Sequence, residues 1–178
     1  MLNYIIEDIV EVLQYLPYGL VAAAIAASLD LLRNRYRGKR GKGRLSPALG
    51  AALACYWVVL AYTVYFCRPP GSRSGVDLTL FGTLGGPKSN AFVVENVLLF
   101  IPFGIMVPMR YRWLHRFSDC VLLGMGFSIF IETIQYYTGR GFTQLDDVVM
   151  NTLGTICGYL IYYAIVSVRR TVGRIFFG

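Results

Sequence analysis

Charged residues are scarce in this sequence: they make up 15% of its 178 residues, whereas hydrophobic residues make up 56%. A soluble domain of this length would need more polar surface. The hydrophobic residues also occur in long blocks, and charged or Gly/Pro-rich segments separate these blocks. Because a helix needs about 20 apolar residues to cross the hydrocarbon core, the pattern predicts an all-α, polytopic membrane helix bundle.

Histidine is almost absent, since His115 is the single one, and none of the four cysteines stands in a CxxC spacing. Cys55 and Cys157 fall inside apolar blocks, so the cysteines predict neither a disulfide framework nor a soft-metal site. No GxSxG motif or histidine base indicates a hydrolase of the usual kind. The chain shows no internal repeat, which disfavours an inverted-repeat transporter.

Five apolar blocks are long enough to cross a membrane. They run roughly over residues 12–32, 47–66, 90–109, 120–137 and 148–168. The first is the weakest, because Pro17 and Asp30 bracket its centre, but a helix that kinks or begins at Pro17 is still compatible with a span. The N-terminal segment carries Glu7, Asp8 and Glu11 where a signal peptide would be basic. We therefore expect the first block to stay in the mature protein.

Basic residues are concentrated in alternate connecting segments of this five-span topology. The segment 33–44 holds seven Lys or Arg residues and no acid. Because short basic loops stay in the cytoplasm, we expect 33–44, the loop at 110–116 and the C-terminal tail to lie inside, and the N-terminus outside. The inside segments then hold 13 basic residues and the outside segments 4. The simplest role of 33–44 is to set topology beside anionic lipid head groups, and nucleic-acid binding is a poor alternative for so short a tethered loop.

Polar residues gather in the stretch FIETIQYYTGRGFTQLDDVVMN, residues 130–151, which joins the fourth and fifth blocks. In the five-span topology this stretch lies on the outer side, where the third block also begins. Polar groups of three helices are therefore expected to meet at the outer edge of the bilayer and form a pocket. The candidate pocket residues are Glu95, Asn96, Ser128, Glu132, Gln135, Arg140, Asp146, Asp147 and Asn151.

Helical spacing places these polar residues in line with small ones. One face of the fourth helix carries Gly124, Ser128, Glu132 and Gln135, and one face of the fifth carries Asp147, Asn151, Gly154 and Gly158. The GxxxG spacing at 154–158 predicts close packing of the fourth helix on the fifth. In the third helix two prolines predict a kink, which could frame a cavity or be ordinary for a spanning helix. The expected packing residues are Pro102, Gly104, Pro108, Gly154 and Gly158.

The charges of the candidate pocket do not balance, because four acids (Glu95, Glu132, Asp146 and Asp147) face one nearby cation, Arg140. One interpretation is that Glu132 simply pairs with Arg140 while the amides join helices. The three remaining carboxylates favour instead a raised pKa, a bound cation or a basic ligand. A divalent cation held by Glu132, Asp146 and Asp147 is one such occupant. We therefore favour a functional pocket.

Two motifs in this region resemble the VanZ-like family of bacterial membrane proteins, which is named for a teicoplanin resistance protein. They are NVLLFIPFGIMVP (96–108) and SIFIETIQYYTGRGFTQLDDVVMNTLGTICGY (128–159). The resemblance covers roughly residues 77–163, although the stretch VDLTLFG before the first motif matches only loosely. It implies a VanZ-like transmembrane domain over 46–168. An N-terminal span with its basic loop (1–45) precedes this domain, and a basic tail (169–178) follows it.

The resemblance implies a multi-pass protein of the bacterial cytoplasmic membrane that is linked to tolerance of lipoglycopeptide antibiotics, and it implies no reaction. From the residues we favour a non-enzymatic pocket for an amphiphile, either a lipoglycopeptide such as teicoplanin or a lipid-linked cell-wall precursor. Glu132, Asp146 and Asp147 would meet amines, and Arg140 would meet an anion. The alternatives are a membrane-embedded enzyme that uses the carboxylates as acid and base or as metal ligands, and a transporter. Membrane lipid is the expected partner, and the oligomeric state is left open.

Overall fold

The computed structural model describes residues 1–39, 45–71, 75–83 and 85–177, apart from the side chains of 170 and 172–177. Its helices are α1 (Leu2–Leu13), α2 (Leu16–Lys39), α3 (Pro47–Ala61), α4 (Pro87–Arg110), α5 (Phe117–Thr138) and α6 (Leu145–Phe177). A π-helical segment, η1 (Tyr62–Phe66), continues α3, and a 3-10 turn, η2 (Arg112–Leu114), precedes α5. The short strands β1 (Val76–Asp77) and β2 (Thr143–Gln144) pair in parallel. The predicted all-α class is confirmed.

Five of the helical segments in the described part of the chain are long and apolar enough to cross a membrane. They are Leu16–Lys39, Pro47–Phe66, Pro87–Arg110, Phe117–Thr138 and Leu145–Arg169. This confirms the five predicted spans. The first span begins at Leu16, directly before Pro17, and the residues preceding it form the separate helix α1. Proline is tolerated in the first turn because the amide it lacks would have no partner there.

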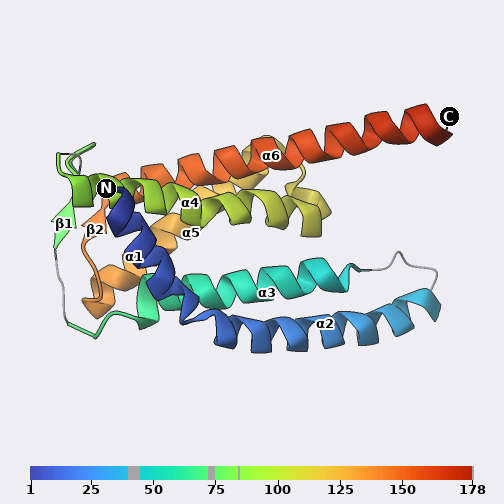
Figure 1. Ribbon diagram of the computed structural model, residues 1–178, viewed down its shortest axis with the longest axis horizontal. Helices are drawn as coiled ribbons and strands as arrows, with labels where there is room; N and C mark the ends of the chain where they lie inside the picture. The colour runs from blue at the N-terminus through green and yellow to red at the C-terminus, as the bar shows by residue number, and fades with distance from the viewer. Residues whose placement is uncertain (40–44, 72–74, 84, 178) are drawn as a thin grey trace.

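The helices form two groups (Figure 1). The α2–α3 hairpin makes up one group, and α4, α5 and α6 make up the other. Within the second group α4 and α6 run in the same direction, and α5 returns between them in sequence. The helix α1 crosses from the start of α4 to the start of α2 at one end of the bundle. Stacking of Tyr15 and Tyr18 on Tyr62, with ring centroids 5.3 and 5.0 Å apart, holds the connection between α1 and α2 against η1.

Small residues allow the backbones of α4 and α6 to touch. A Cβ added at Gly154 or Gly158 would overlap the carbonyl oxygen of Val97 or Ile101 on α4, respectively. A Cβ at Gly104 of α4 would likewise overlap backbone atoms of α6. The prediction that the GxxxG glycines pack on α5 was therefore wrong, since they face α4. The small face of α5 does pack on α6 as predicted, because a Cβ added at Gly124 would overlap the Thr155 side chain. The spacing of small residues identifies a contact face but not the helix that fills it.

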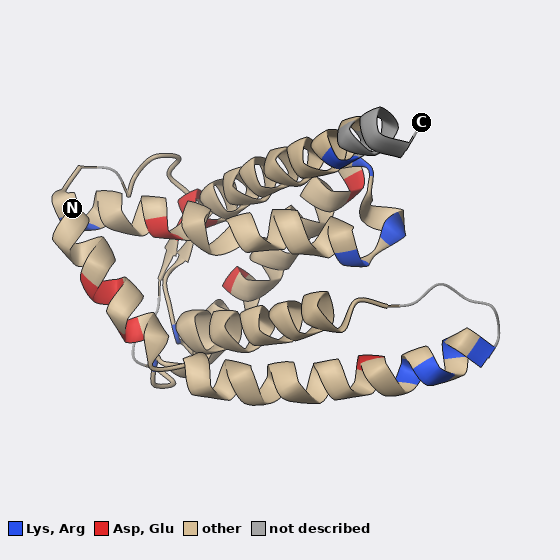
Figure 2. Cartoon of the chain, turned by 45° about the vertical axis from the view of Figure 1, so that its right-hand side comes forward, with Lys and Arg blue, Asp and Glu red and all other residues tan. Residues whose placement is uncertain are grey.

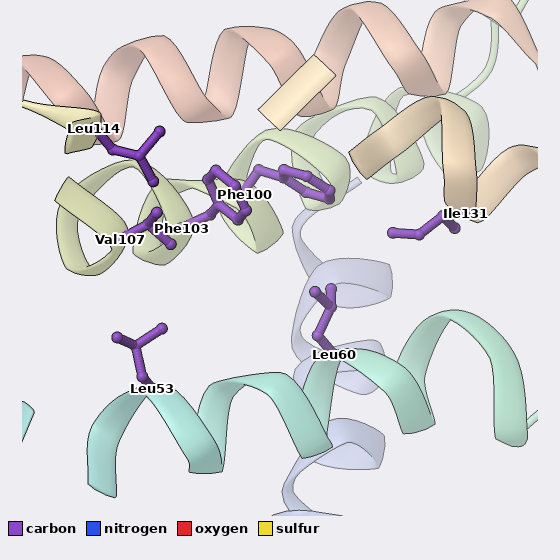
Figure 3. Close-up of a cluster of buried hydrophobic side chains, with 7 residues drawn as sticks. All are labelled: Leu53, Leu60, Phe100, Phe103, Val107, Leu114 and Ile131. Carbon is purple, nitrogen blue, oxygen red and sulfur yellow. The ribbon is translucent and has the colours of Figure 1, made fainter. Parts of the chain in front are cut away.

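The apolar core lies between the two groups. Its buried side chains are Leu53, Leu60, Phe100, Phe103, Val107, Leu114 and Ile131. In Figure 3 the two leucines of α3 lie opposite the aromatic side chains of α4. Trp57 lies in the same layer and packs edge-on against Phe103 and Phe127, with ring centroids 5.8 and 4.9 Å away. The aromatic core thus joins α3, α4 and α5 half-way along the bundle.

Charged residues divide between the two ends of the bundle (Figure 2). Most described Lys and Arg residues lie at the end where α2 and α4 finish, which we call the basic end. The opposite end holds α1, the beginnings of α4 and α6 and the end of α5. We call it the polar-cluster end, because the candidate pocket residues on these helices lie toward it. Residues 40–44 of the predicted basic loop fall outside the described residues.

Candidate functional site

Hydrogen bonds between side chains join α4, α5 and α6 at the polar-cluster end. Asn96 of α4 donates from Nδ2 to Oδ1 of Asp147 of α6 over 2.7 Å. One turn further along α6, Asn151 donates from Nδ2 to Oγ of Ser128 of α5 over 2.8 Å. The Asn151 and Ser128 side chains are both buried. The structure therefore brings four of the predicted pocket residues together as two interhelical bonds.

Glu132 of α5 holds the segment that connects α5 with α6. Its side chain is 4% exposed, and Oε2 accepts a hydrogen bond from the backbone N–H of Gln144 over 3.0 Å. The Thr143 hydroxyl donates to the Glu132 carbonyl oxygen over 3.2 Å. Since these two acceptors hold both residues of β2, Glu132 sets the position of the strand that pairs with β1. A carboxylate in this place has a structural role beside any chemical one.

Arg140 does not pair with Glu132, although both residues lie in the described part of the chain. Its Nη1 donates to the carbonyl oxygens of Tyr65 and Arg68 over 3.1 and 3.0 Å, and its guanidinium lies 4.3 Å from the centre of the Tyr65 ring. The interpretation of a simple Glu132–Arg140 pair was therefore wrong. Arg140 instead closes the carbonyl end of η1, and its buried Nε finds no hydrogen-bond partner among the described residues.

Arg68, which the sequence indicated only as one of the four basic residues of the outer segments, is a cation near the carboxylates. Arg68 interacts electrostatically with both Glu132 and Asp147. Its guanidinium also lies beside Gly141, where an added Cβ would come within 2.9 Å of Nη1. Arg68 follows the second predicted span by two residues, so its depth relative to the membrane could be predicted from the sequence. No spacing rule linked it to α5 or α6.

Asp146 holds the loop that precedes α4. Its two carboxylate oxygens accept hydrogen bonds from the backbone N–H groups of Phe81 and Thr83 over 2.6 and 2.9 Å, and its side chain is 2% exposed. Phe81 has a φ of 61°, a conformation that costs energy for a non-glycine residue. Asp146 is therefore committed to stabilising this loop. The described residues include no group of three or more His, Cys, Asp or Glu side chains that could hold a metal ion, so the structure offers no such site at Glu132, Asp146 and Asp147.

Two further predicted residues face neighbours outside the α4–α5–α6 group. Glu95 interacts with Asp8 of α1, and its buried Oε1 finds no hydrogen-bond partner in the described chain. Gln135 donates from Nε2 to the carbonyl oxygen of Val64 in η1 over 2.6 Å. In η1 each hydrogen bond spans five residues, which leaves carbonyls displaced from the usual ladder. Gln135 and Arg140 together satisfy carbonyls of this segment.

An apolar cavity of about 370 Å³ lies between α3–η1 and α5, and we call it the α5 cavity. Its lining residues are Trp57, Leu60, Ala61, Val64, Tyr65, Phe66, Phe127, Phe130, Ile131 and Ile134. None of the nine predicted pocket residues lines it, within the part of the chain that the structure describes. Gln135 and Arg140 adjoin it without lining it, since they donate to the backbone carbonyl oxygens of Val64 and Tyr65, and we call this side of the cavity its rim. The structure thus separates an apolar cavity from a bonded polar network beside it.

A comparison with protein families identifies the chain. The VanZ/LLP1 family model matches residues 50–167. This chain belongs to the VanZ/LLP1 family. Protein VanZ of Enterococcus faecium is 29% identical over 120 residues, which cover 62% of this chain and 70% of the relative. No solved structure matches the chain. The chain is accordingly a multi-pass membrane protein of this family, and the family region extends from α3 to α6.

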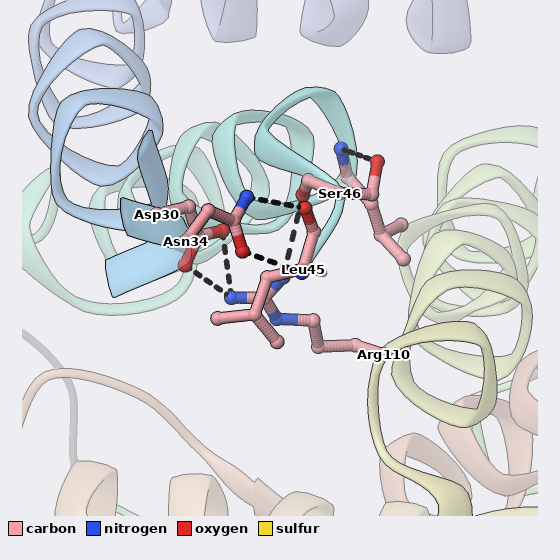
Figure 4. A network of polar contacts seen from close by, with 6 residues as sticks. Asp30, Asn34, Leu45, Ser46 and Arg110 are labelled. Carbon is pink, nitrogen blue, oxygen red and sulfur yellow. Dashed lines mark hydrogen bonds and ion pairs between the residues drawn. The ribbon is translucent and has the colours of Figure 1, made fainter. Parts of the chain in front are cut away.

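A second polar network links the VanZ/LLP1 region to α2 at the basic end (Figure 4). Nη2 of Arg110 donates to both carboxylate oxygens of Asp30 over 2.7 Å each, and Nη1 donates to the Ser46 carbonyl oxygen over 3.3 Å. Beside this pair the Asn34 side chain bonds to both the backbone N–H and C=O of Leu45. In the sequence, Asp30 weakened the prediction of the first span, and Arg110 belonged to a loop that indicated topology. The two residues are 80 positions apart, so neither pattern predicts their contact.

Proposed function

We propose that this VanZ/LLP1 family protein is a non-enzymatic component of the bacterial cell envelope that binds an amphiphile in the α5 cavity. The observation that carries the proposal is an apolar cavity whose rim holds an arginine: Tyr65 lines the cavity, and the Arg140 guanidinium lies over its ring. The ligand is a lipoglycopeptide such as teicoplanin or a lipid-linked cell-wall precursor. By holding it, the protein contributes to glycopeptide resistance.

The cavity suits the apolar chain of such a ligand. Its walls are aliphatic and aromatic side chains, and each methylene buried there contributes about 0.8 kcal/mol relative to water. The Arg140 guanidinium, which lies over the ring of Tyr65 in the cavity wall, carries the positive charge that would attract a carboxylate or phosphate. The apolar chain of the ligand would therefore lie in the cavity, and its head group would lie beside Arg140. Glu132 and Asp146 accept hydrogen bonds from backbone amides, which favours binding over acid–base catalysis.

The charge distribution supports an outward-facing cavity in the cytoplasmic membrane. Cytoplasmic loops carry an excess of Lys and Arg, and the basic end of the bundle has that excess. The N-terminus then lies outside, and the α5 cavity opens in the outer half of the bilayer. Lipoglycopeptides and exposed cell-wall precursors meet the membrane on that side.

Tryptophan fluorescence tests the proposal, because the chain has two tryptophans and Trp57 lines the cavity. Trp113 is 66% exposed, so Trp113→Phe leaves Trp57 as the sole reporter. In nanodiscs, teicoplanin and a polyprenyl phosphate are titrated against this variant, with vancomycin as a glycopeptide that lacks the acyl chain. We expect one or both chain-bearing probes to change Trp57 emission with saturation and vancomycin to leave it unchanged.

A variant whose new side chain fills the α5 cavity distinguishes specific binding of a probe from its partitioning into lipid. Ala61 lines the α5 cavity, whereas Ala52 is exposed on the same helix. We expect Ala61→Phe to weaken binding by about tenfold, since a phenyl ring would overpack the site. Ala52→Phe is the matched control and should bind like the parent. Equal affinities of these two variants, or equal responses to vancomycin and teicoplanin, would refute the proposed function.

A further inference from the structure

A second cavity, of about 190 Å³, lies between α2, α3 and α4, and we call it the α2 cavity. Its lining residues are Ala26, Leu29, Asp30, Arg33, Gly50, Leu53, Ala54, Trp57, Arg110 and Tyr111. Unlike the α5 cavity it has charged walls at its far end, where Asp30 bonds Arg110. Trp57 belongs to the lining of both cavities. The indole is therefore the partition between them.

Neighbouring aromatic rings support the Trp57 partition. The indole meets the rings of Phe103 and Phe127 edge-on, at interplanar angles of 90° and 76°. A third ring, that of Tyr56, lies 5.4 Å away, and its hydroxyl donates to the Leu99 carbonyl oxygen. Side chains that are held on several sides by packing keep one rotamer. Contacts with three rings thus restrain the indole at the floor of the α5 cavity.

The depth of the α5 cavity follows from the residues that line it. On α3–η1 these residues extend from Trp57 to Phe66, and on α5 from Phe127 to Ile134. At 1.5 Å per residue these stretches are about 13 and 10 Å long. With carbon–carbon bonds of about 1.5 Å, an extended chain advances by about 1.25 Å per methylene, so the cavity takes about eight to ten carbons below its rim.

We propose that Trp57 is a chain-length ruler, which limits the ligand of the α5 cavity to an amphiphile with a single unbranched chain of about ten carbons and an anionic head group at Arg140. This inference rests on the proposed function, since it takes the α5 cavity as the ligand site. It selects between the two ligand classes named above. The acyl chain of a lipoglycopeptide fits this depth, whereas the polyprenyl chain of a lipid-linked precursor is several times longer. Charge complementarity supports the occupant, because the positively charged guanidinium of Arg140 lies over the ring of Tyr65, which lines the cavity.

Alkyl phosphates that carry a terminal diazirine and have chains of 8, 10, 12, 14 and 16 carbons measure directly how long a chain the α5 cavity accepts. After photolysis in nanodiscs, peptide mapping locates the residue that each chain end reaches. With the natural protein we expect the 10-carbon probe to label the cavity floor at Trp57 or Phe127. The 14- and 16-carbon probes should label that floor less, and they should not reach Leu53 or Ala54 in the α2 cavity.

Trp57→Leu opens the partition while it keeps an apolar side chain there. In this variant we expect the 16-carbon probe to label Leu53 or Ala54 about fivefold more than in the natural protein, because added methylenes gain burial beyond the former floor. Trp113→Leu removes an exposed indole and is the matched control. Trp57→Phe, which shortens the side chain less, keeps the test decisive should the leucine variant fail to fold. Trp57→Phe should lengthen the accepted chain by fewer carbons than Trp57→Leu does.

The outcomes separate the ruler from the proposed function. Labelling of the α5 cavity that does not change with chain length, or equal labelling of Leu53 and Ala54 in the natural and Trp57 variants, overturns the ruler alone. If no probe labels the α5 cavity in any variant, the proposed function fails, and the ruler fails with it. A shift toward longer chains in Trp57→Leu and none in Trp113→Leu supports both.

Discussion

Replacing Asp30 with Asn would leave the Arg110 guanidinium without its counter-charge inside the bundle. The side chains of Asp30 and Arg110 are only 3% and 13% exposed, and Nη2 reaches both carboxylate oxygens. In the variant one oxygen becomes an NH₂ group, which faces a donor and accepts nothing. The network that joins α2 to the VanZ/LLP1 region would therefore lose its central contact.

Removing one partner of a buried ion pair costs about 3–5 kcal/mol, because the other charge stays desolvated and unpaired. Arg110 keeps its bond to the Ser46 carbonyl oxygen and is partly exposed, which places the expected loss near the lower figure, about 3 kcal/mol. For a chain of this length that corresponds to a fall in Tm of about 6–12 °C. Thermal unfolding of the purified protein in one detergent, followed by size-exclusion chromatography of the heated samples, measures it.

A charge-free pair tests the physical reason. We expect Asp30→Leu combined with Arg110→Met to lie within about 1 kcal/mol of the natural protein, since no buried charge is left unpaired. Glu7→Gln, at an exposed site of α1, should change stability by less than about 0.5 kcal/mol. Unfolding of Asp30→Asn at the same temperature as the natural protein would refute this account of the ion pair. A double variant whose loss of unfolding free energy equals the sum of the losses of Asp30→Leu and Arg110→Met alone would refute it as well.

Two further predictions concern helix packing and orientation. Gly158→Ala should lower the unfolding free energy by about 2–3 kcal/mol, because its Cβ would overlap the Ile101 carbonyl oxygen. Gly126→Ala is the control and should be neutral in the same thermal assay, since a Cβ there meets nothing within 4 Å in the described structure. Equal stability of the two variants would contradict the α4–α6 backbone contact. On intact cells an impermeant maleimide should label the exposed Cys67 and spare Ser118→Cys at the basic end, if the basic end faces the cytoplasm. The reverse labelling would invert the bundle.

The spans and the depth of polar groups could be predicted from the sequence. Each span is a property of about 20 consecutive residues, so hydropathy locates it without knowledge of its neighbours. Depth follows from distance along a helix, which is why Asn96, Glu132 and Asn151 were expected near one end of the bundle, where the structure places them. The start of a helix beside Pro17, at Leu16, was likewise one of two outcomes that local chemistry allowed.

The partners of these polar groups could not be predicted in the same way. Arg140 was expected to meet an anionic ligand or, in the other interpretation, Glu132, and it instead donates to the carbonyl oxygen of Tyr65 in η1. Asp146 was expected to be free for a ligand, but it accepts hydrogen bonds from Phe81 and Thr83. Each correct partner lies far away in the sequence. A side chain's contacts depend on the rotation of its helix and on which helix packs beside it, and both are set by the shape of the whole interior.

By itself, then, the sequence determined what is local: which segments cross the membrane, at what depth their polar groups lie and which end of the bundle is basic. Only the tertiary structure decided that the glycines of α6 face α4, that Asp30 meets Arg110 and that Trp57 separates two cavities. The physical reason is that hydropathy and helical rise act along the chain. Packing, ion pairing and cavities arise between segments whose relative rotation no single segment encodes.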